Sequence, residues 1–225
     1  DCLLSRGLGD VYKRQIYINM KEKILVTGGT GYIGSHTVVE LQNAGYEVVI
    51  IDNLSNSSAD VVDNIEKVSG IRPAFEKLDC LDYAGLDAVF AKYKGIKAII
   101  HFAASKAVGE SVEKPLLYYR NNLVSLINLL ELMPKHGVEG IVFSSSCTVY
   151  GQPDHLPVTE EAPIKKAESP YGNTKQINEE IVRDTVASGA PINAILLRYF
   201  NPIGAHPSAP VSYTHLRAHE TRGNL

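Results

Sequence analysis

Tyr171 and Lys175, in the stretch "SPYGNTKQINEE" (169–180), have side chains and a spacing suited to proton transfer. Ser169 is a favourable N-cap and Pro170 a favourable first helical residue, so we expect a helix to begin here. Tyr171 and Lys175 then stand at i and i+4 on one helical face. A free tyrosine has a pKa of about 10, which a nearby ammonium lowers by roughly 1–3 units. The pair is therefore a candidate general base with a cationic partner.

The same spacing occurs on many amphipathic helices, so neighbouring segments must decide between chemistry and an ordinary surface pair. Upstream, the stretch "FSSSCTVYG" (143–151) is typical of the end of a buried strand. It places the hydroxyl groups of Ser146 and Thr148 at the edge of the sheet where ligands bind in α/β folds. This order of segments favours the catalytic interpretation.

Short apolar runs alternate with amphipathic segments through the middle of the chain. The expected strands are 23–27, 47–52, 73–78, 97–103, 140–145 and 193–200. The expected helices are 32–44, 60–69, 82–94, 115–136 and 170–188, which end at or near Gly45, Gly70, Gly95, Gly137 and Gly189. Several strands are apolar throughout, as in parallel sheets covered on both faces. The sequence predicts an α/β fold with a doubly wound parallel sheet of the Rossmann type.

A glycine-rich loop, "VTGGTGYIG" (26–34), follows the first strand and opens the first helix. Gly28, Gly31 and Gly34 suit a tight turn, a close approach to a pyrophosphate and close packing of helix on strand. Packing alone would also explain glycines here. Asp52 then ends the second strand, where a carboxylate can bind ribose hydroxyls and repel a 2′-phosphate, so we expect NAD rather than NADP.

Charge and cysteine content exclude several classes of protein. The net charge is −3 with both signs interspersed, which argues against a nucleic-acid or membrane surface. No apolar run approaches the roughly 20 residues of a membrane span. Cys2, Cys80 and Cys147 show no paired spacing, so we expect reduced thiols, a cytoplasmic location and no bound metal.

The two ends differ from the middle. Residues 1–19 and 209–225 lack its periodicity and resemble translated adaptor sequence, so we expect non-native tails there. One NAD-binding domain is expected over residues 20–208. His215 and His219 have the spacing of metal ligands on a helix, but they lie in the second tail and we predict no metal there.

Taken in order, these motifs resemble the extended branch of the short-chain dehydrogenase/reductase family, and within it the 4-epimerases of UDP-sugars. The matching stretches are "VTGGTGYIGSHT", "DNLSNS", "HFAASKAVGESVEKPLLYYRNN", "FSSSCTVYG", "SPYGNTK" and "LRYFNPIGAHPS". The resemblance implies that a tyrosine removes the 4-hydroxyl proton while hydride passes to NAD. The 4-keto sugar then turns over in the site and hydride returns to its other face, without net redox change.

The resemblance also implies a role for each matching residue. Tyr171 is the expected base, Lys175 lowers its pKa and binds the nicotinamide ribose, Ser146 binds the sugar O4 and Thr148 lies beside the substrate. The implied cofactor contacts are Gly28, Gly31, Tyr32, Ile33, Gly34, Asp52, Asn53, Leu54, Ser55, Asn56, Ser57, Asp79, Cys80, Phe102, Ala103, Ala104, Ser105, Lys106, Asn121 and Phe200. The further implied sugar-nucleotide contacts are Lys106 and Asn201.

The resemblance ends at "AHPS" (205–208), whereas relatives continue with most of the uridine-diphosphate pocket. We therefore expect the small substrate domain to be largely missing, and the chain alone to bind NAD without epimerising a sugar. An epimerase for N-acetylated sugars, a dehydratase or decarboxylase, and a non-catalytic NAD-binding module are the alternatives. Cys147 and Thr148 stand where the dehydratases and decarboxylases usually carry acidic residues, which favours the epimerase.

A homodimer is the assembly that the resemblance implies, through the helices at 115–136 and 170–188. Apolar residues on these helices could serve either the partner helix or the sheet core. They are Leu123, Leu126, Leu130 and Ile177.

Overall fold

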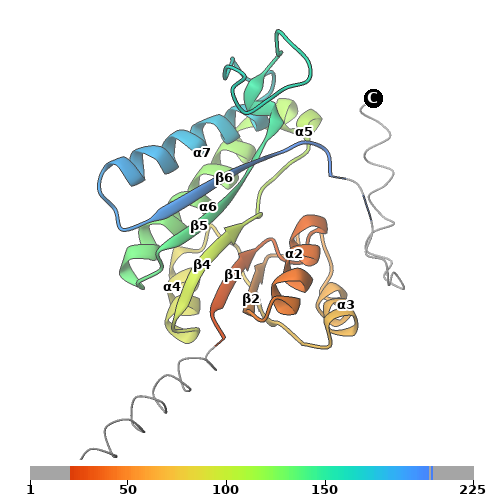
Figure 1. Cartoon of the computed structure of the whole chain (residues 1–225), viewed down its shortest axis with the longest axis vertical. Coiled ribbons are helices and arrows are strands. Elements are labelled where there is room, and N and C mark those ends of the chain that lie inside the picture. The colour runs from red at the N-terminus through yellow and green to blue at the C-terminus, as the bar shows by residue number, and fades with distance from the viewer. Residues whose placement is uncertain (1–20, 203, 205–225) are drawn as a thin grey trace, which may run out of the picture.

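The computed structural model describes residues 21–202 and 204 (Figure 1). The two predicted tails, with His215 and His219, lie outside the described residues. Among the helices of the described part, none is long and apolar enough to cross a membrane.

A six-stranded sheet runs through the molecule with the strand order β3-β2-β1-β4-β5-β6 (Figure 1). The strands are β1 Lys23–Thr27, β2 Glu47–Asp52, β3 Ala74–Lys77, β4 Ile96–His101, β5 Gly140–Ser146 and β6 Asn193–Tyr199. All neighbouring strands are parallel. The predicted doubly wound parallel sheet is confirmed.

Helices cover both faces of this sheet. They are α2 Tyr32–Asn43, α3 Asp60–Ser69, α4 Tyr83–Lys92, α5 Val108–Glu113, α6 Pro115–Lys135 and α7 Pro170–Ala187, with a short 3-10 helix η1 at Cys147–Tyr150. Val26 and Ile50 pack with α2 and α3, whereas Leu25 and Val49 pack with α4, α6 and α7 on the other face. Successive strand residues point to opposite faces, so a strand buried on both sides is apolar throughout.

Local signals set the helix boundaries. The Ser169 hydroxyl accepts a 3.1 Å hydrogen bond from the Gly172 N–H and caps α7, as predicted. Gly70 ends α3 with a φ of 74°, and its N–H donates to the Glu66 carbonyl oxygen. The sequence predicts neither α5 nor η1, because six and four residues are too few to show a helical period.

The apolar residues of α6 divide into two groups. Leu126 is fully buried and Leu130 is 6% exposed, and both belong to the core against the sheet. Leu116 and Leu117 are 81% and 50% exposed. Of the four residues that the sequence assigns to either the core or a partner, Leu126 and Leu130 therefore belong to the core, whereas Leu123 and Ile177 are only partly buried.

The chain crosses the sheet in two directions from its centre. β1 leads through α2 to β2 on one side, whereas β4 leads through α6 to β5 on the other. The carboxyl ends of β1 and β4 flank this change of direction, which is where open α/β sheets bind ligands.

Candidate active site

The glycine-rich loop packs directly against the chain that leaves β4. Gly28 has a φ of 70°, and a Cβ atom there would lie 2.7 Å from the Ala103 backbone nitrogen. A Cβ atom at Gly34 would lie 2.2 Å from the Gly28 carbonyl oxygen. Both contacts involve backbone, so packing excludes side chains at these two positions. Gly28 and Gly31 are partly exposed, so a ligand can still approach the loop backbone there, and the packing and binding interpretations are compatible.

The first turn of α2 can receive an anion. Gly31 is the N-cap, no side chain caps the turn, and no acidic side chain lies in it. Tyr32 and Ile33 begin the helix, where the N–H groups and the helix dipole favour negative charge. The Tyr32 hydroxyl donates to the carbonyl oxygen of Gly204, 2.5 Å away, which brings the chain after β6 to the same place. These residues fit the pyrophosphate of a dinucleotide.

Asp52 holds two loops together at the end of β2. Its carboxylate accepts hydrogen bonds from the Thr30 N–H at 3.2 Å, the Leu54 N–H at 2.9 Å and the Ser57 hydroxyl at 3.2 Å. It is 8% exposed. This bracing of the glycine-rich loop is a role that sequence reasoning missed. The predicted contacts with a ribose would be additional to it.

The expected adenosine side lies next to Asp52. The Asn53 side chain donates a 2.9 Å hydrogen bond to Asp79, which joins the segments that follow β2 and β3. Ser55 and Asn56 are exposed on the same loop. Cys80 is 6% exposed and packs in the core, and burial raises the pKa of its thiol to about 12. Any cofactor contact of Cys80 therefore falls to its backbone.

The segment after β4, residues 102–106, is fixed by α6. Asn122 accepts from the Ser105 N–H at 2.8 Å and donates to the Ser105 carbonyl oxygen at 3.0 Å. Asn121 donates to the Ser105 hydroxyl at 3.0 Å. The Asn122 amide also donates to the Thr174 hydroxyl on α7, 3.1 Å away. Asn122, which the sequence does not single out, therefore links the predicted cofactor segment to the helix of the predicted base.

Tyr171 and Lys175 face the carboxyl end of β5. The Lys175 ammonium donates to the Ser144 carbonyl oxygen at 2.7 Å and lies 5.8 Å from the centroid of the Tyr171 ring. The Ser146 hydroxyl lies close enough to the Tyr171 phenol to lower its pKa. The structure thus brings the predicted serine, tyrosine and lysine together at the end of one strand.

Burial dominates the ionisation of this pair. It raises the pKa of Tyr171 above the ordinary value, against the opposing effect of the Ser146 hydroxyl. Lys175 is 3% exposed, and burial lowers the pKa of its ammonium to about 8. In this chain by itself, removal from water favours the neutral phenol. The predicted lowering, which combines the ammonium with the charge of a bound nicotinamide, stays a prediction.

Thr148 lies beside the start of α7. Its hydroxyl oxygen is buried, and the described residues offer it no hydrogen-bond partner. A Cβ atom added at Gly172 would lie 3.4 Å from that oxygen. A buried hydroxyl without a partner costs about 1–3 kcal/mol. The predicted place of Thr148 beside the substrate stays a prediction.

Three further predicted residues lie at the surface of the same sheet edge. Lys106 and Asn201 are exposed, and Phe200 is 57% exposed. They follow β4 and β6. Their roles toward a cofactor or substrate stay predictions.

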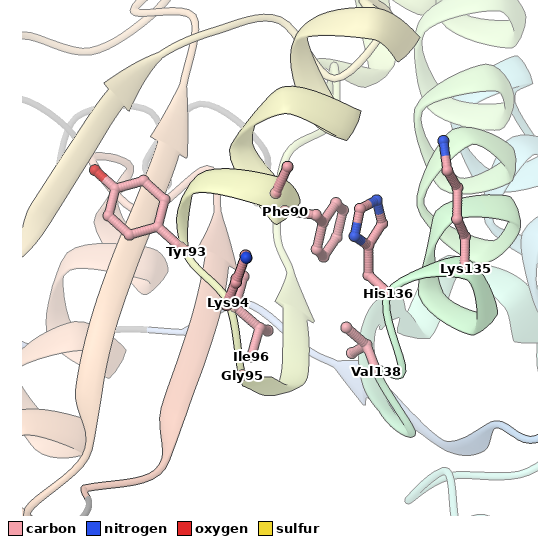
Figure 2. Close-up of a pocket in the computed structure, with 9 residues that line it drawn as sticks. Phe90, Tyr93, Lys94, Gly95, Ile96, Lys135, His136 and Val138 are labelled. Atoms are coloured by element: carbon pink, nitrogen blue, oxygen red, sulfur yellow. The ribbon is translucent and has the colours of Figure 1, made fainter.

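A hollow of about 410 Å³ lies at the other end of the sheet, where β4 begins (Figure 2). Phe90 stacks on His136 within it, with ring centroids 5.3 Å apart. His136 and Lys135 both contact the Asp87 carboxylate, at 2.6 and 2.7 Å. These side chains join α4 to α6, and the hollow lies at the opposite end of β4 from the candidate site.

A parallel sheet of this order with a glycine-rich loop at its switch point defines a dinucleotide-binding α/β protein. The chain belongs to the NAD dependent epimerase/dehydratase family, whose model matches residues 24–222. The expected family resemblance is thus confirmed, and the expected cofactor, NAD, agrees with the family's description.

Comparisons with individual proteins give more specific similarities than the family match does. The chain is 54% identical over 188 residues to UDP-glucose 4-epimerase of Bacillus subtilis, covering 84% of this chain and 55% of that protein. It is 53% identical over 192 residues to UDP-glucose 4-epimerase 2 of Arabidopsis thaliana, covering 84% and 54%. The structure of a Bifidobacterium longum UDP-glucose 4-epimerase in complex with NAD+ and UDP matches with a TM-score of 0.80 and 48% identity, covering 83% and 55%. The chain therefore spans about half the length of the relatives it matches.

Proposed function

We propose that the whole protein interconverts UDP-glucose and UDP-galactose with bound NAD, and that this chain carries the NAD-binding half and the acid–base group. One observation carries the proposal: Ser146, Tyr171 and Lys175 meet at the end of β5, on the sheet edge that holds the glycine-rich loop. The names of the relatives support the choice of substrate.

In the proposed reaction, Tyr171 takes the proton of the sugar 4-hydroxyl and later returns it. NAD accepts hydride from C4 and gives it back to the other face of the 4-keto sugar, so the reaction is redox neutral. Ser146 donates to the sugar O4, and Lys175 binds the nicotinamide ribose. Burial favours the neutral form of Tyr171, so the positive charge of a bound nicotinamide would supply the stabilisation that the phenolate needs.

A chain extended by the C-terminal portion of the Bacillus subtilis relative would test this proposal. UDP-galactose is supplied, and UDP-glucose is measured with a separate dehydrogenase. We expect turnover in the extended chain, and we expect Tyr171→Phe to bind NAD but to lose about 10²–10⁴-fold in kcat. Undiminished turnover in the variant would reject Tyr171 as the base. A parallel assay with UDP-N-acetylgalactosamine decides between plain and N-acetylated sugars.

We propose in addition that the protein forms a homodimer through α6 and α7. The exposed apolar side chains along α6 support this, because contiguous exposed apolar surface marks interaction sites. They are Leu116, Leu117, Val124 and Ile127. Sedimentation of the extended chain measures its mass directly. The unpaired thiols of Cys80 and Cys147 support a cytoplasmic location, which fractionation of the source cells would test.

A further inference from the structure

Each of the last three residues of β5 contacts a residue on one face of α7. Residues 144–146 contact three α7 residues that follow one another at intervals of one helical turn. The contacts are Ser144 with Lys175, Ser145 with Glu179, and Ser146 with Tyr171. The first and third involve groups of the proposed reaction, whereas the contact of Ser145 with Glu179 has no part in it.

Glu179 is a buried carboxylate, 1% exposed, that receives hydrogen bonds from three side chains. Ser145 donates at 2.6 Å and Arg183 at 2.6 Å. Arg198 donates to both carboxylate oxygens, from Nε at 2.9 Å and from Nη2 at 2.8 Å. Burial alone would raise the pKa of Glu179, but these donors outweigh it and hold the pKa below its ordinary value. Glu179 is therefore a stable anion in a site closed to water.

Arg198 extends the same contact beyond the end of β5. It stands directly opposite Ser145 in the pairing of β5 with β6. Its Nη1 donates to the Tyr150 hydroxyl at 3.0 Å, and its guanidinium carbon lies 4.9 Å from the centroid of the Tyr150 ring. Tyr150 ends η1, the turn that follows Ser146. One ion pair thus holds the chain immediately before Ser146 and shortly after it.

We propose that Glu179 and Arg198 are positioning residues, whose ion pair holds Ser146 against Tyr171 by fixing both flanks of Ser146 to α7. This rests on the proposed function only in assigning Tyr171 the acid–base role. A displacement of the end of β5 along α7 would move the Ser146 hydroxyl away from Tyr171, and such contacts must be kept within about 0.5 Å to be effective.

A purely structural role is the competing explanation, and energetics argue against it as the whole account. Replacing a buried ion pair by apolar residues of similar size is often neutral or stabilising, so stability alone does not require one. Directional bonds from a bidentate guanidinium fix position better than apolar packing does. The ion pair also lies next to the proposed catalytic groups, because Glu179 is one helical turn beyond Lys175 on α7.

The test uses this chain without cofactor or substrate, labelled with ¹³C at the hydroxyl-bearing carbon of its tyrosines. The Tyr171 signal, assigned by its loss in Tyr171→Phe, reports the hydrogen bonding and ionisation of the phenol. Ser146→Ala gives the shift caused by removing the partner. We expect Glu179→Gln to move the Tyr171 signal in the same direction by about half that shift or more. Glu180→Gln, an exposed neighbour on α7, is the matched control and should leave the signal in place.

The double variant Glu179→Met with Arg198→Met is a second test for the case in which Glu179→Gln misfolds, because removing both charges leaves neither one buried and unpaired. We expect it to unfold at a urea concentration near that of the natural chain and still to displace the Tyr171 signal. If that signal coincides with the Glu180→Gln control while Ser146→Ala displaces it, the pair is structural and the proposal is wrong. The proposal is also wrong if Ser146→Ala does not shift the Tyr171 signal. Neither result depends on NAD binding or turnover, so the proposed function is judged separately.

Discussion

The Lys175 ammonium is anchored to the backbone of β5 by its 2.7 Å hydrogen bond to the Ser144 carbonyl oxygen. A single neutral acceptor offsets little of the lost hydration of an ammonium. This is why burial lowers the pKa of Lys175 to about 8. The lysine that binds the cofactor in the proposed reaction is therefore a destabilising group in the folded chain.

Stability should accordingly depend on pH through Lys175. Its pKa is lowered from 10.5 to about 8, so the unfolded chain binds this proton more tightly than the folded chain does. The penalty is present in full below pH 8 and shrinks as the pH rises toward 10.5. Relative to Lys175→Met, the natural chain should gain about 2 kcal/mol of unfolding free energy between pH 7 and 10. Urea titrations of both chains measure this, and a difference that stays constant with pH would contradict the assignment. Lys77→Met, at an exposed position, is the control.

A methyl group at Gly34 should disrupt the cofactor loop. The added Cβ would lie 2.2 Å from the Gly28 carbonyl oxygen, so the loop or α2 must move. We expect Gly34→Ala to lose about 1–3 kcal/mol of stability and at least about tenfold in NAD affinity, measured by calorimetry. Gly109→Ala meets open space and should bind NAD as the natural chain does. Equal NAD affinities in the two variants would show that the loop does not form the site.

Removing the Asp52 carboxylate should make the loop at residues 53–57 more mobile, and it should also weaken the preference for NAD over NADP. Asp52→Ala leaves the Thr30 and Leu54 N–H groups without this acceptor. We expect a loss of about 1–3 kcal/mol and faster amide exchange over residues 53–57. The ratio of NAD to NADP affinity should fall as well, because no carboxylate remains to repel a 2′-phosphate. Asp60→Ala, in an exposed position on α3, should leave the ratio unchanged.

Substitutions at two leucines of α6 should distinguish a core position from a position in the proposed dimer interface. Leu126→Ala removes a fully buried side chain and should cost about 2–5 kcal/mol of unfolding free energy. Leu116 is 81% exposed, so Leu116→Ala should change monomer stability by less than about 0.5 kcal/mol. In the extended chain, Leu116→Asp should lower the sedimenting mass toward that of a monomer. An unchanged mass would place any dimer interface elsewhere.

Local sequence patterns were enough to predict most of the fold and part of the candidate site. Apolar strands and helix-ending glycines are short-range signals, so the order of elements could be predicted, and Gly70 ends its helix as expected. The serine, tyrosine and lysine could be found because each has a fixed place in a motif.

The contacts that position these residues could not be found in the same way. Asn122 and Arg198 act on partners in other elements, so their neighbours in sequence carry no sign of them. Glu179 is the exception, since its spacing from Tyr171 and Lys175 places it on the same helical face. The raised pKa of Tyr171 was missed for a related reason: burial depends on the whole fold, whereas the i+4 lysine is visible locally.

The pairing of Glu179 with Arg198 also constrains the order in which the molecule can be completed during synthesis. α7 leaves the ribosome before β6, so the carboxylate is made before the guanidinium that contacts both its oxygens. Burying an unpaired carboxylate is strongly unfavourable. Arg183, on the same helix, is available to this carboxylate earlier, so α7 should dock on the nascent sheet more firmly once β6 supplies the second guanidinium, that of Arg198.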